Sequence, residues 1–326
     1  MDQVQYELHV TRLPMELRQL RYFVAIADSG SFSKAAERVF VAQSALSHQL
    51  AQLEGELGAA LFHRSRRGVT LTEAGSRFFP HAVSILRQAE EALASARSTD
   101  AEPSGKLVFG IPHSASHALA LPLLRAVRQQ LPKVQLELTE ELTGNLSKQL
   151  RTGQIQLAVL FDDGQTSEFA CQPLLREQMY LIEPAGGAPR KARVTLKQVL
   201  AMPLILPASP HGVRPIIEAA AARAGLAPPQ VDADISSISI LRTTLLAGLG
   251  RTLLPIMPLR QEIEAGQLCA TAVGSPPLER TLLLCAAKHI PPSAASQAVE
   301  RLTLKLVRAL CQSGEWLGAK VIAGKN

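Results

Sequence analysis

Four polar residues near the start of the sequence have side chains that could read the base edges of DNA: Gln43, Ser44, Ser47 and His48. Their spacing places all four on one side of a helix. Amide, hydroxyl and imidazole groups can hydrogen-bond to base edges and phosphates, and no carboxylate on this face would repel them. The alternative is an ordinary solvated polar face. The surrounding elements must decide between these two interpretations.

A basic run follows about one helix later. Arg64, Arg66 and Arg67 precede Gly68, and residues 69–72 then alternate apolar side chains with threonines. This pattern predicts a small hairpin with a basic tip. Arginines on such a tip suit phosphate contact or insertion into a narrow minor groove. A solvated charge run is the alternative, but the nearby polar face favours the hairpin.

The elements that must position these side chains form a recognisable arrangement. Apolar residues recur at three- and four-residue steps over 16–29, which predicts a first helix. A second, short helix begins at Ser33, interpreted as its N-cap, and ends near Phe40. A third begins near Ala42. Two short helices joined this tightly and braced by another are typical of a helix-turn-helix.

A long amphipathic helix is predicted over residues 72–98, with Pro80 interrupting its early part. Its apolar residues have the spacing of a heptad seam, which favours a partner helix and hence a dimer. The alternative is a single helix packed on its own chain. The seam residues, taken as the dimerisation site, are Phe79, Ala82, Leu86, Ala89 and Leu93.

Residues 99–105 are polar and rich in helix breakers, which indicates a hinge. Beyond it, strands alternate with helices, and this alternation predicts a parallel-rich sheet. Two such sets follow each other, so we expect two α/β lobes with a cleft between them. The predicted strands are 106–111, 134–142, 155–161, 179–184, 203–207, 231–236 and 281–287. The predicted helices are 114–132, 143–153, 214–224, 240–249 and 297–310.

Open α/β sheets bind ligands at the carboxyl ends of their strands, often where helix N-termini attract anions. Three loops of this chain qualify, and Arg214 could pair with a carboxylate or phosphate. Serine and asparagine at helix starts are more often simple caps, which is the alternative here. The candidate effector-binding residues are His113, Ser114, Ser116, Thr143, Asn145, Ser209, His211 and Arg214.

Composition narrows the function classes. The 326 residues include 47% hydrophobic and 19% charged side chains, which is ordinary for a folded protein of more than one domain. The net charge of +6 favours an anionic partner. Residues 15–98, however, hold ten Lys or Arg against eight Asp or Glu, so charge supports DNA binding only weakly.

The opening residues have neither a secretory signal nor a membrane-length apolar stretch, so we expect a cytoplasmic protein without a membrane partner. Residues 1–14 lack periodicity and are expected to be poorly ordered; Met1 or Met15 could be the true start. Four widely spaced cysteines show no C-x-x-C pair, so reduced, buried thiols are expected rather than disulfides or metal ligands. These are Cys171, Cys269, Cys285 and Cys311.

Catalysis is not expected. The segment 113–117, HSASH, mixes serine and histidine, but the motifs G-x-S-x-G, G-x-x-x-x-G-K-[ST] and H-E-x-x-H are absent. Two glycines in GLGRTLLP are too few for a dinucleotide fingerprint, and no carboxylate or metal-spaced cluster is evident. We expect no cofactor and no metal.

The N-terminal segment closely resembles the DNA-binding domain of LysR-type transcription regulators. The matching stretches, in order, are FVAIA, SFSKAA, QSALSHQL, LEGELGAALFHR and VTLTEAG. The resemblance assigns Gln43, Ser44 and Ser47 to the major groove and Arg64 to the wing, with Ser33 as a backbone or capping contact. Many family members have Ser or Thr at the position of Ala42, and Pro at the position of Ser44. Losing a capping hydroxyl at residue 42 costs roughly 1 kcal/mol.

The resemblance also implies an organisation for the whole chain. It comprises a winged helix-turn-helix over 15–73, a linker helix over 72–98, and a two-lobed effector domain over 106–312 similar to periplasmic binding proteins. Lobe I is expected at about 106–180 and 281–312, lobe II at about 181–280, and a tail at 313–326. Within the family, GKLVFGIPHSASHALALPLLRAV and LPASPHGVR are most similar to nitrogen assimilation control regulators.

The expected partners are double-stranded DNA, a second copy of the chain as a dimer or dimer of dimers, and RNA polymerase. A small-molecule co-inducer of unknown identity would bind the cleft and shift the placement of dimers on an interrupted, A/T-leaning palindrome. The alternatives are a DNA-binding regulator without an effector, a solute-binding protein and an enzyme. The missing leader and the N-terminal 75 residues argue against a solute-binding protein.

Overall fold

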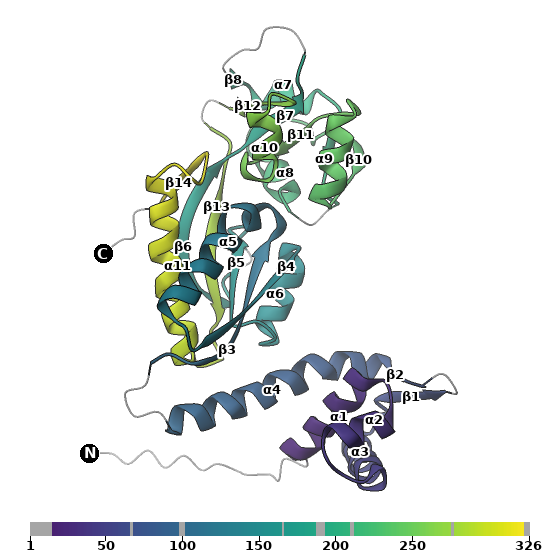
Figure 1. Cartoon of the computed structure of the whole chain (residues 1–326). Helices are drawn as coiled ribbons and strands as arrows, with labels where there is room; N and C mark the ends of the chain where they lie inside the picture. The colour runs from purple at the N-terminus through teal and green to yellow at the C-terminus, as the bar shows by residue number, and fades with distance from the viewer. Residues whose placement is uncertain are drawn as a thin grey trace, which may run out of the picture. The chain divides into compact units, whose positions relative to one another are not determined.

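The computed structural model describes residues 15–65, 68–97, 102–164, 166–186, 193–208, 212–274 and 277–322, and it divides into two compact units, 1–98 and 99–326 (Figure 1). Each unit has its own hydrophobic core. Among the described residues, no helix is both long enough and apolar enough to cross a bilayer.

The first unit consists of three short helices, a two-stranded hairpin and one long helix. Its elements are α1 Leu17–Ser29, α2 Phe32–Arg38, α3 Gln43–Leu57, β1 Phe62–Ser65, β2 Gly68–Leu71 and α4 Glu73–Arg97. Phe23 lies at the centre of the core, with its ring centroid 5.3 Å from that of Phe62 and 5.2 Å from that of Phe78. These contacts join α1, the hairpin and α4, so the domain's three parts share one apolar centre.

The first half of α4 packs on its own domain. Ala82 is fully buried in the core of the first unit, and Phe79 and Leu86 are partly buried against it. The seam therefore has a local partner in this half of the helix, which is the alternative that the sequence left open. Leu93, farther along, is 58% exposed. The helix runs on through Pro80 to Arg97.

The second unit has two lobes. In lobe I the elements are β3 Gly105–Pro112, α5 His113–Gln130, β4 Val134–Glu141, α6 Thr143–Arg151, β5 Leu157–Phe161, β6 Phe169–Gln178, β13 Glu279–Ala287, α11 Ala294–Gln312 and β14 Ala319–Val321. The sheet order is β14-β6-β13-β5-β3-β4. Helices α5 and α11 cover one face and α6 the other (Figure 1).

Lobe II is smaller. Its elements are β7 Tyr180–Pro184, β8 Arg193–Val194, α7 Leu196–Leu200, β9 Leu204–Leu206, α8 Arg214–Arg223, β10 Val231–Asp234, α9 Ile238–Leu246, β11 Thr252–Leu254, a 3-10 turn Met257–Leu259, α10 Arg260–Glu264 and β12 Leu268–Val273. One sheet has the order β11-β7-β12-β8, and β9 pairs with β10 in parallel. A hydrogen bond of 2.8 Å from the Ile205 amide to the Arg251 carbonyl links them.

Three sequence-based expectations for this unit were wrong. Strand β6 was missed, because Pro173 and charged side chains interrupt its apolar alternation. The lobe I sheet is mixed rather than parallel-rich, since β13 pairs antiparallel with both β5 and β6. Residues 313–326 were predicted to be a tail, yet Trp316 is 1% exposed and β14 extends the sheet.

The cysteine prediction was also wrong in part. Cys171 on β6 lies directly opposite Cys285 on β13, and the two form a disulfide across 114 residues of sequence. Cys269 and Cys311 are free thiols. The pairing depends on the register of two strands far apart in the chain, which spacing in the sequence does not reveal.

A buried ion pair stands where the chain crosses between the lobes. Arg280 donates from Nε to Glu177 Oε2 at 2.7 Å, and Trp316 donates from Nε1 to Glu177 Oε1 at 2.6 Å. Both charged side chains are fully buried. Beside them, the Gln178 side chain on one crossing segment donates to the carbonyls of Val273 and Leu278 on the other.

Replacing Glu177 with glutamine should destabilise lobe I by about 3–5 kcal/mol, because the Arg280 charge would remain buried without a counter-charge. Trp316 is the single tryptophan of the chain, so its fluorescence during urea unfolding reports on this lobe. The exposed neighbour Glu315 provides a control, and Glu315→Gln should change stability by less than about 1 kcal/mol. Equal stability of the Glu177→Gln variant and the wild type would contradict a structural role for the pair.

Candidate DNA interface and effector cleft

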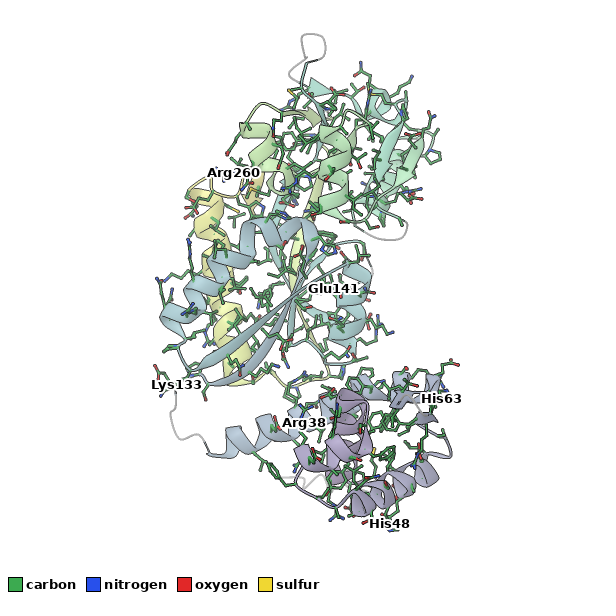
Figure 2. The ribbon with its side chains drawn as sticks, turned by 45° about the vertical axis from the view of Figure 1, so that its right-hand side comes forward. Arg38, His48, His63, Lys133, Glu141 and Arg260 are labelled. Carbon is green, nitrogen blue, oxygen red and sulfur yellow. A yellow bond between two sulfur atoms is a disulfide. The ribbon has the colours of Figure 1, made fainter. Side chains whose placement is uncertain are left out.

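The predicted base-reading residues lie at the start of α3. Gln43, Ser44 and His48 are exposed, Ser47 is half-buried, and Figure 2 shows His48 at the outside of the domain. Leu46, Leu50 and Leu53 anchor the opposite side of the helix in the core. Ala42 is the N-cap of α3 and makes no side-chain capping bond, so the first helical amides are left for other acceptors.

Ser33 has a different local role from the one expected. Ser31, not Ser33, is the N-cap of α2, where its hydroxyl accepts from the Lys34 amide. The Ser33 hydroxyl instead donates to Gln43 Oε1 at 2.9 Å. This bond joins α2 to α3 and holds the Gln43 amide in one orientation. The Gln43 Nε2 group makes no hydrogen bond to the described residues, so it can donate to an acceptor on DNA.

The hairpin after α3 is held in place by backbone contacts. The Glu54 side chain accepts from the Leu61 amide at 2.7 Å, and the Val69 amide donates to the Gly30 carbonyl at 3.0 Å. A Cβ on Gly68 would lie 2.9 Å from that same carbonyl, so glycine permits the close approach. The Arg64 guanidinium lies 4.4 Å from the centre of the Phe32 ring. Arg66 and Arg67 lie outside the described residues.

Phe40, in the turn between α2 and α3, is a feature that the sequence interpretation missed. Its φ of 57° is unusual for a bulky residue, and its side chain is 93% exposed. Nothing in the structure explains why an aromatic residue stands here.

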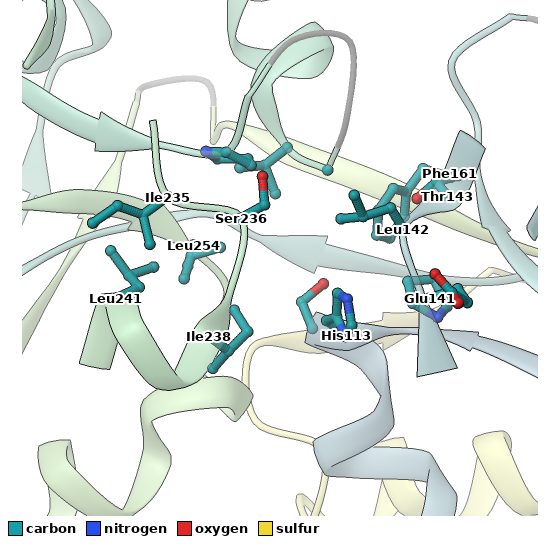
Figure 3. Close-up of a pocket in the computed structure, with 15 residues that line it drawn as sticks. His113, Glu141, Leu142, Thr143, Phe161, Ile235, Ser236, Ile238, Leu241 and Leu254 are labelled. Atoms are coloured by element: carbon teal, nitrogen blue, oxygen red, sulfur yellow. The ribbon is translucent and has the colours of Figure 1, made fainter. Parts of the chain in front are cut away.

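The second unit has a pocket between its lobes, lined by residues from both. Lobe I contributes His113, Ser114 and Thr143, three of the predicted effector residues, together with Phe161 and Glu141. Lobe II contributes an apolar wall, shown opposite them in Figure 3, that the sequence interpretation missed. Its members include Val213, Ile235, Ile238, Leu241 and Leu254.

Two hydroxyl-bearing residues, Ser114 and Thr143, mark the lobe I side of this pocket. The Thr143 hydroxyl is buried and has no hydrogen-bond partner, and Ser114 is only 7% exposed. Helices α5 and α6 start here, and neither has a side-chain cap. The pocket thus presents hydroxyl groups and helix N-termini on one side and hydrocarbon on the other.

The pocket itself is small, about 40 Å³, and a larger hollow of about 440 Å³ adjoins it. The two share His113, Leu142, Ser236 and Ile238. His113 Nδ1 lies 2.9 Å from Glu140 Oε1, which fixes the imidazole at the rim. Among the described residues, no cluster of three or more His, Cys, Asp or Glu side chains suits a metal ion.

Three of the other predicted effector residues, Ser116, Asn145 and Arg214, are not among the residues that line this pocket. Ser116 bonds to the His113 carbonyl and to Glu140, and Asn145 bonds to Glu141. Arg214 donates to Glu218 at 2.7 Å and to Asp234 at 2.8 Å, and these hydrogen bonds raise the pKa of its guanidinium. Its charge is thus paired within the protein rather than offered to a ligand. Ser209 and His211 lie outside the described residues.

The chain matches two protein families in succession. Residues 17–76 match "Bacterial regulatory helix-turn-helix protein, lysR family", and residues 100–307 match "LysR substrate binding domain".

Comparisons with individual proteins point to the same family. The chain is 36% identical to the nitrogen assimilation regulatory protein nac of Klebsiella aerogenes, over 90% of this chain and 95% of that protein. It is 32% identical to the nac protein of Escherichia coli K12, over 93% of this chain and 99% of that protein. A full-length OxyR variant from Pseudomonas aeruginosa has a similar fold, with a TM-score of 0.69 at 24% identity over 90% of this chain and 95% of that one. The chain belongs to the LysR family of transcription regulators, which bind DNA through a helix-turn-helix and are not enzymes.

Proposed function

We propose that this regulator binds DNA as a two-fold symmetric dimer in the cytoplasm and that a small molecule in the interlobe cleft changes its action on transcription. The single observation that carries the DNA-reading half is the Ser33–Gln43 hydrogen bond, which aligns an exposed amide at the start of α3. In helix-turn-helix proteins the N-terminal residues of the second helix contact base edges. Ser44, Ser47, His48 and Arg64 would add contacts to bases or phosphates around it.

Self-association through α4 is part of this proposal. Leu93 is 58% exposed, and Ala89 lies one turn before it on the same seam. Phe79, Ala82 and Leu86 already pack on the first unit, so the distal half of the helix is the part left to contact a second copy. A dimer presents two reading helices, so its operator should be two-fold symmetric. Dimers of dimers and contact with RNA polymerase would follow on such an operator.

Selection of bound duplexes from a random-sequence pool, read by sequencing, tests the DNA-reading proposal. The wild type should enrich a two-fold symmetric motif. Gln43→Ala should weaken binding to it about 5- to 150-fold, the cost of about 1–3 kcal/mol for a lost base contact. Gln52 is also exposed but lies about two and a half turns farther along α3, beyond the N-terminal residues that contact bases, so Gln52→Ala should bind like the wild type. Failure to enrich any motif would overturn the proposal.

The proposal of an effector rests on the buried, unpartnered Thr143 hydroxyl in the lining of a largely apolar pocket. A buried hydroxyl without a partner costs free energy that a bound acceptor or donor would recover. The ligand that suits this pocket is a small amphipathic molecule, with its polar end at Ser114 and Thr143 and its hydrocarbon against lobe II. Binding would hold the two lobes together, and its effect depends on different affinities for two arrangements of the regulator.

A melting screen of small metabolites, followed by Trp316 fluorescence, should identify at least one stabilising compound. At 100 times its Kd a ligand adds about 2.7 kcal/mol to stability. Thr143→Val keeps the shape and removes the hydroxyl, so it should weaken binding about 2- to 12-fold, for one hydrogen bond of about 0.5–1.5 kcal/mol. Ser147→Ala, one turn along α6 and outside the pocket lining, should have no effect. If no compound stabilises the wild type, the chain regulates without an effector.

A further inference from the structure

The Cys171–Cys285 pair has no role in the proposed DNA reading or ligand contact, yet it lies beneath the helix that begins at the effector pocket. It joins the neighbouring strands β6 and β13 in the lobe I sheet, and Cys285 is completely buried. Above it pack Leu146 and Leu150 of α6, which belong to the same small core. Helix α6 begins at Thr143, the residue whose hydroxyl faces the cleft.

A disulfide is unusual in a protein of this kind. A regulator of bacterial transcription works beside the chromosome, where thiol systems keep most cysteines reduced. Disulfides that do form there are usually transient and redox-sensing. A purely structural cross-link would therefore be poorly suited to the place where the chain acts.

The two cysteines differ in access in the way that a stepwise exchange requires. Cys171 is only partly buried, whereas Cys285 is completely buried beneath α6, so Cys171 is the cysteine that a small molecule would meet first. The Thr166 carbonyl lies 3.9 Å from Cys171 Sγ and gives the reduced thiol an acceptor. Both redox states thus have a place for the Cys171 sulfur.

We propose that Cys171 and Cys285 are a reversible modification site for low-molecular-weight disulfides, and that their redox state controls how firmly α6 docks beside the effector cleft. The Cys171 thiolate attacks one sulfur of the small disulfide, releasing one small thiol and leaving a mixed disulfide on Cys171. Cys285 then attacks Cys171 Sγ and releases the second small thiol. Two protein thiols are oxidised, and one small disulfide is reduced to two thiols.

Packing provides the coupling to α6. Two unbonded sulfurs need the separation of ordinary heavy-atom contacts, about 3.5–4 Å, so reduction requires extra room in a close-packed core. The eight buried residues of this small core include two from α6. Reduction should therefore loosen the docking of α6 and move Thr143 relative to the pocket.

The remaining cysteines serve as internal controls. Cys311 is half-buried next to Glu177, and burial together with that carboxylate raises the pKa of its thiol to about 11, so it stays protonated and unreactive. Cys269 lies in lobe II on β12. A double variant, Cys269→Ser with Cys311→Ser, should retain the full redox response.

The test starts with the full chain treated with oxidised or reduced glutathione, then denatured and alkylated with N-ethylmaleimide. Mass spectrometry should find two alkylated cysteines after oxidation and four after reduction, and peptide mapping should find 171 linked to 285. Excess reduced glutathione should restore the four-thiol form. A protein with no 171–285 link after oxidation, or with a link that resists reduction, would overturn the reversible site.

Hydrogen exchange then tests the coupling. Reduction should speed amide exchange in α6, residues 143–151, at least about tenfold, while α8 in lobe II stays unchanged. Cys171→Ser should exchange like the reduced protein under both treatments. Equal exchange in α6 of both redox states would overturn the coupling. This part of the inference rests on the proposed cleft, but neither readout uses DNA or an effector, so the two proposals can fail separately.

Discussion

The geometry of the second unit depends on the buried contact between Glu177 and Arg280. These residues lie on the two segments where the chain passes between the lobes, and neither charge reaches solvent. Trp316 completes the carboxylate's hydrogen bonds and ties the C-terminal segment to the same point. A paired charge in a dry core tolerates little displacement, because any separation leaves an unsolvated ion. The crossing is therefore a fixed pivot rather than a loose linker.

One aromatic ring, that of Phe161, lies between the buried ion pair and the pocket. The Arg280 guanidinium lies 4.2 Å from the centre of the Phe161 ring, and Phe161 lines the pocket. Strand β13, which carries Arg280, also carries Cys285, and Cys285 packs in one small core with α6, the helix that begins at Thr143 on the same lobe I side of the pocket. Strand β13 thus connects the pivot, the pocket and the disulfide. Movement of the lobes and docking of α6 share this one rigid element.

The sequence contained enough to predict the class of protein, the fold class and the placement on one helix of the residues proposed to read DNA. Apolar periodicity and the succession of motifs over residues 16–75 are local signals, so one sequence carries them. The same local signals found His113, Ser114 and Thr143, because helix starts after strands can be recognised from residue types alone.

What the sequence could not provide depends on contacts between distant segments. The disulfide and the contacts of Glu177 join residues more than 100 positions apart, and the apolar lobe II wall gathers residues from separate helices, strands and loops. Arg214 looked available for a ligand because its two carboxylate partners, Glu218 and Asp234, meet it only in the folded lobe. Ser33 was assigned as a cap because its true partner, Gln43, lies on the next helix.

We propose that two copies of this chain read one operator through α3. Hydroxyl-radical footprinting of the full-length protein on a selected operator tests this most directly. Two protected segments should lie on one face of the duplex, with their centres one helical turn of about 10 base pairs, or a multiple of it, apart. A single protected segment, or protection spread evenly along the DNA, would contradict it.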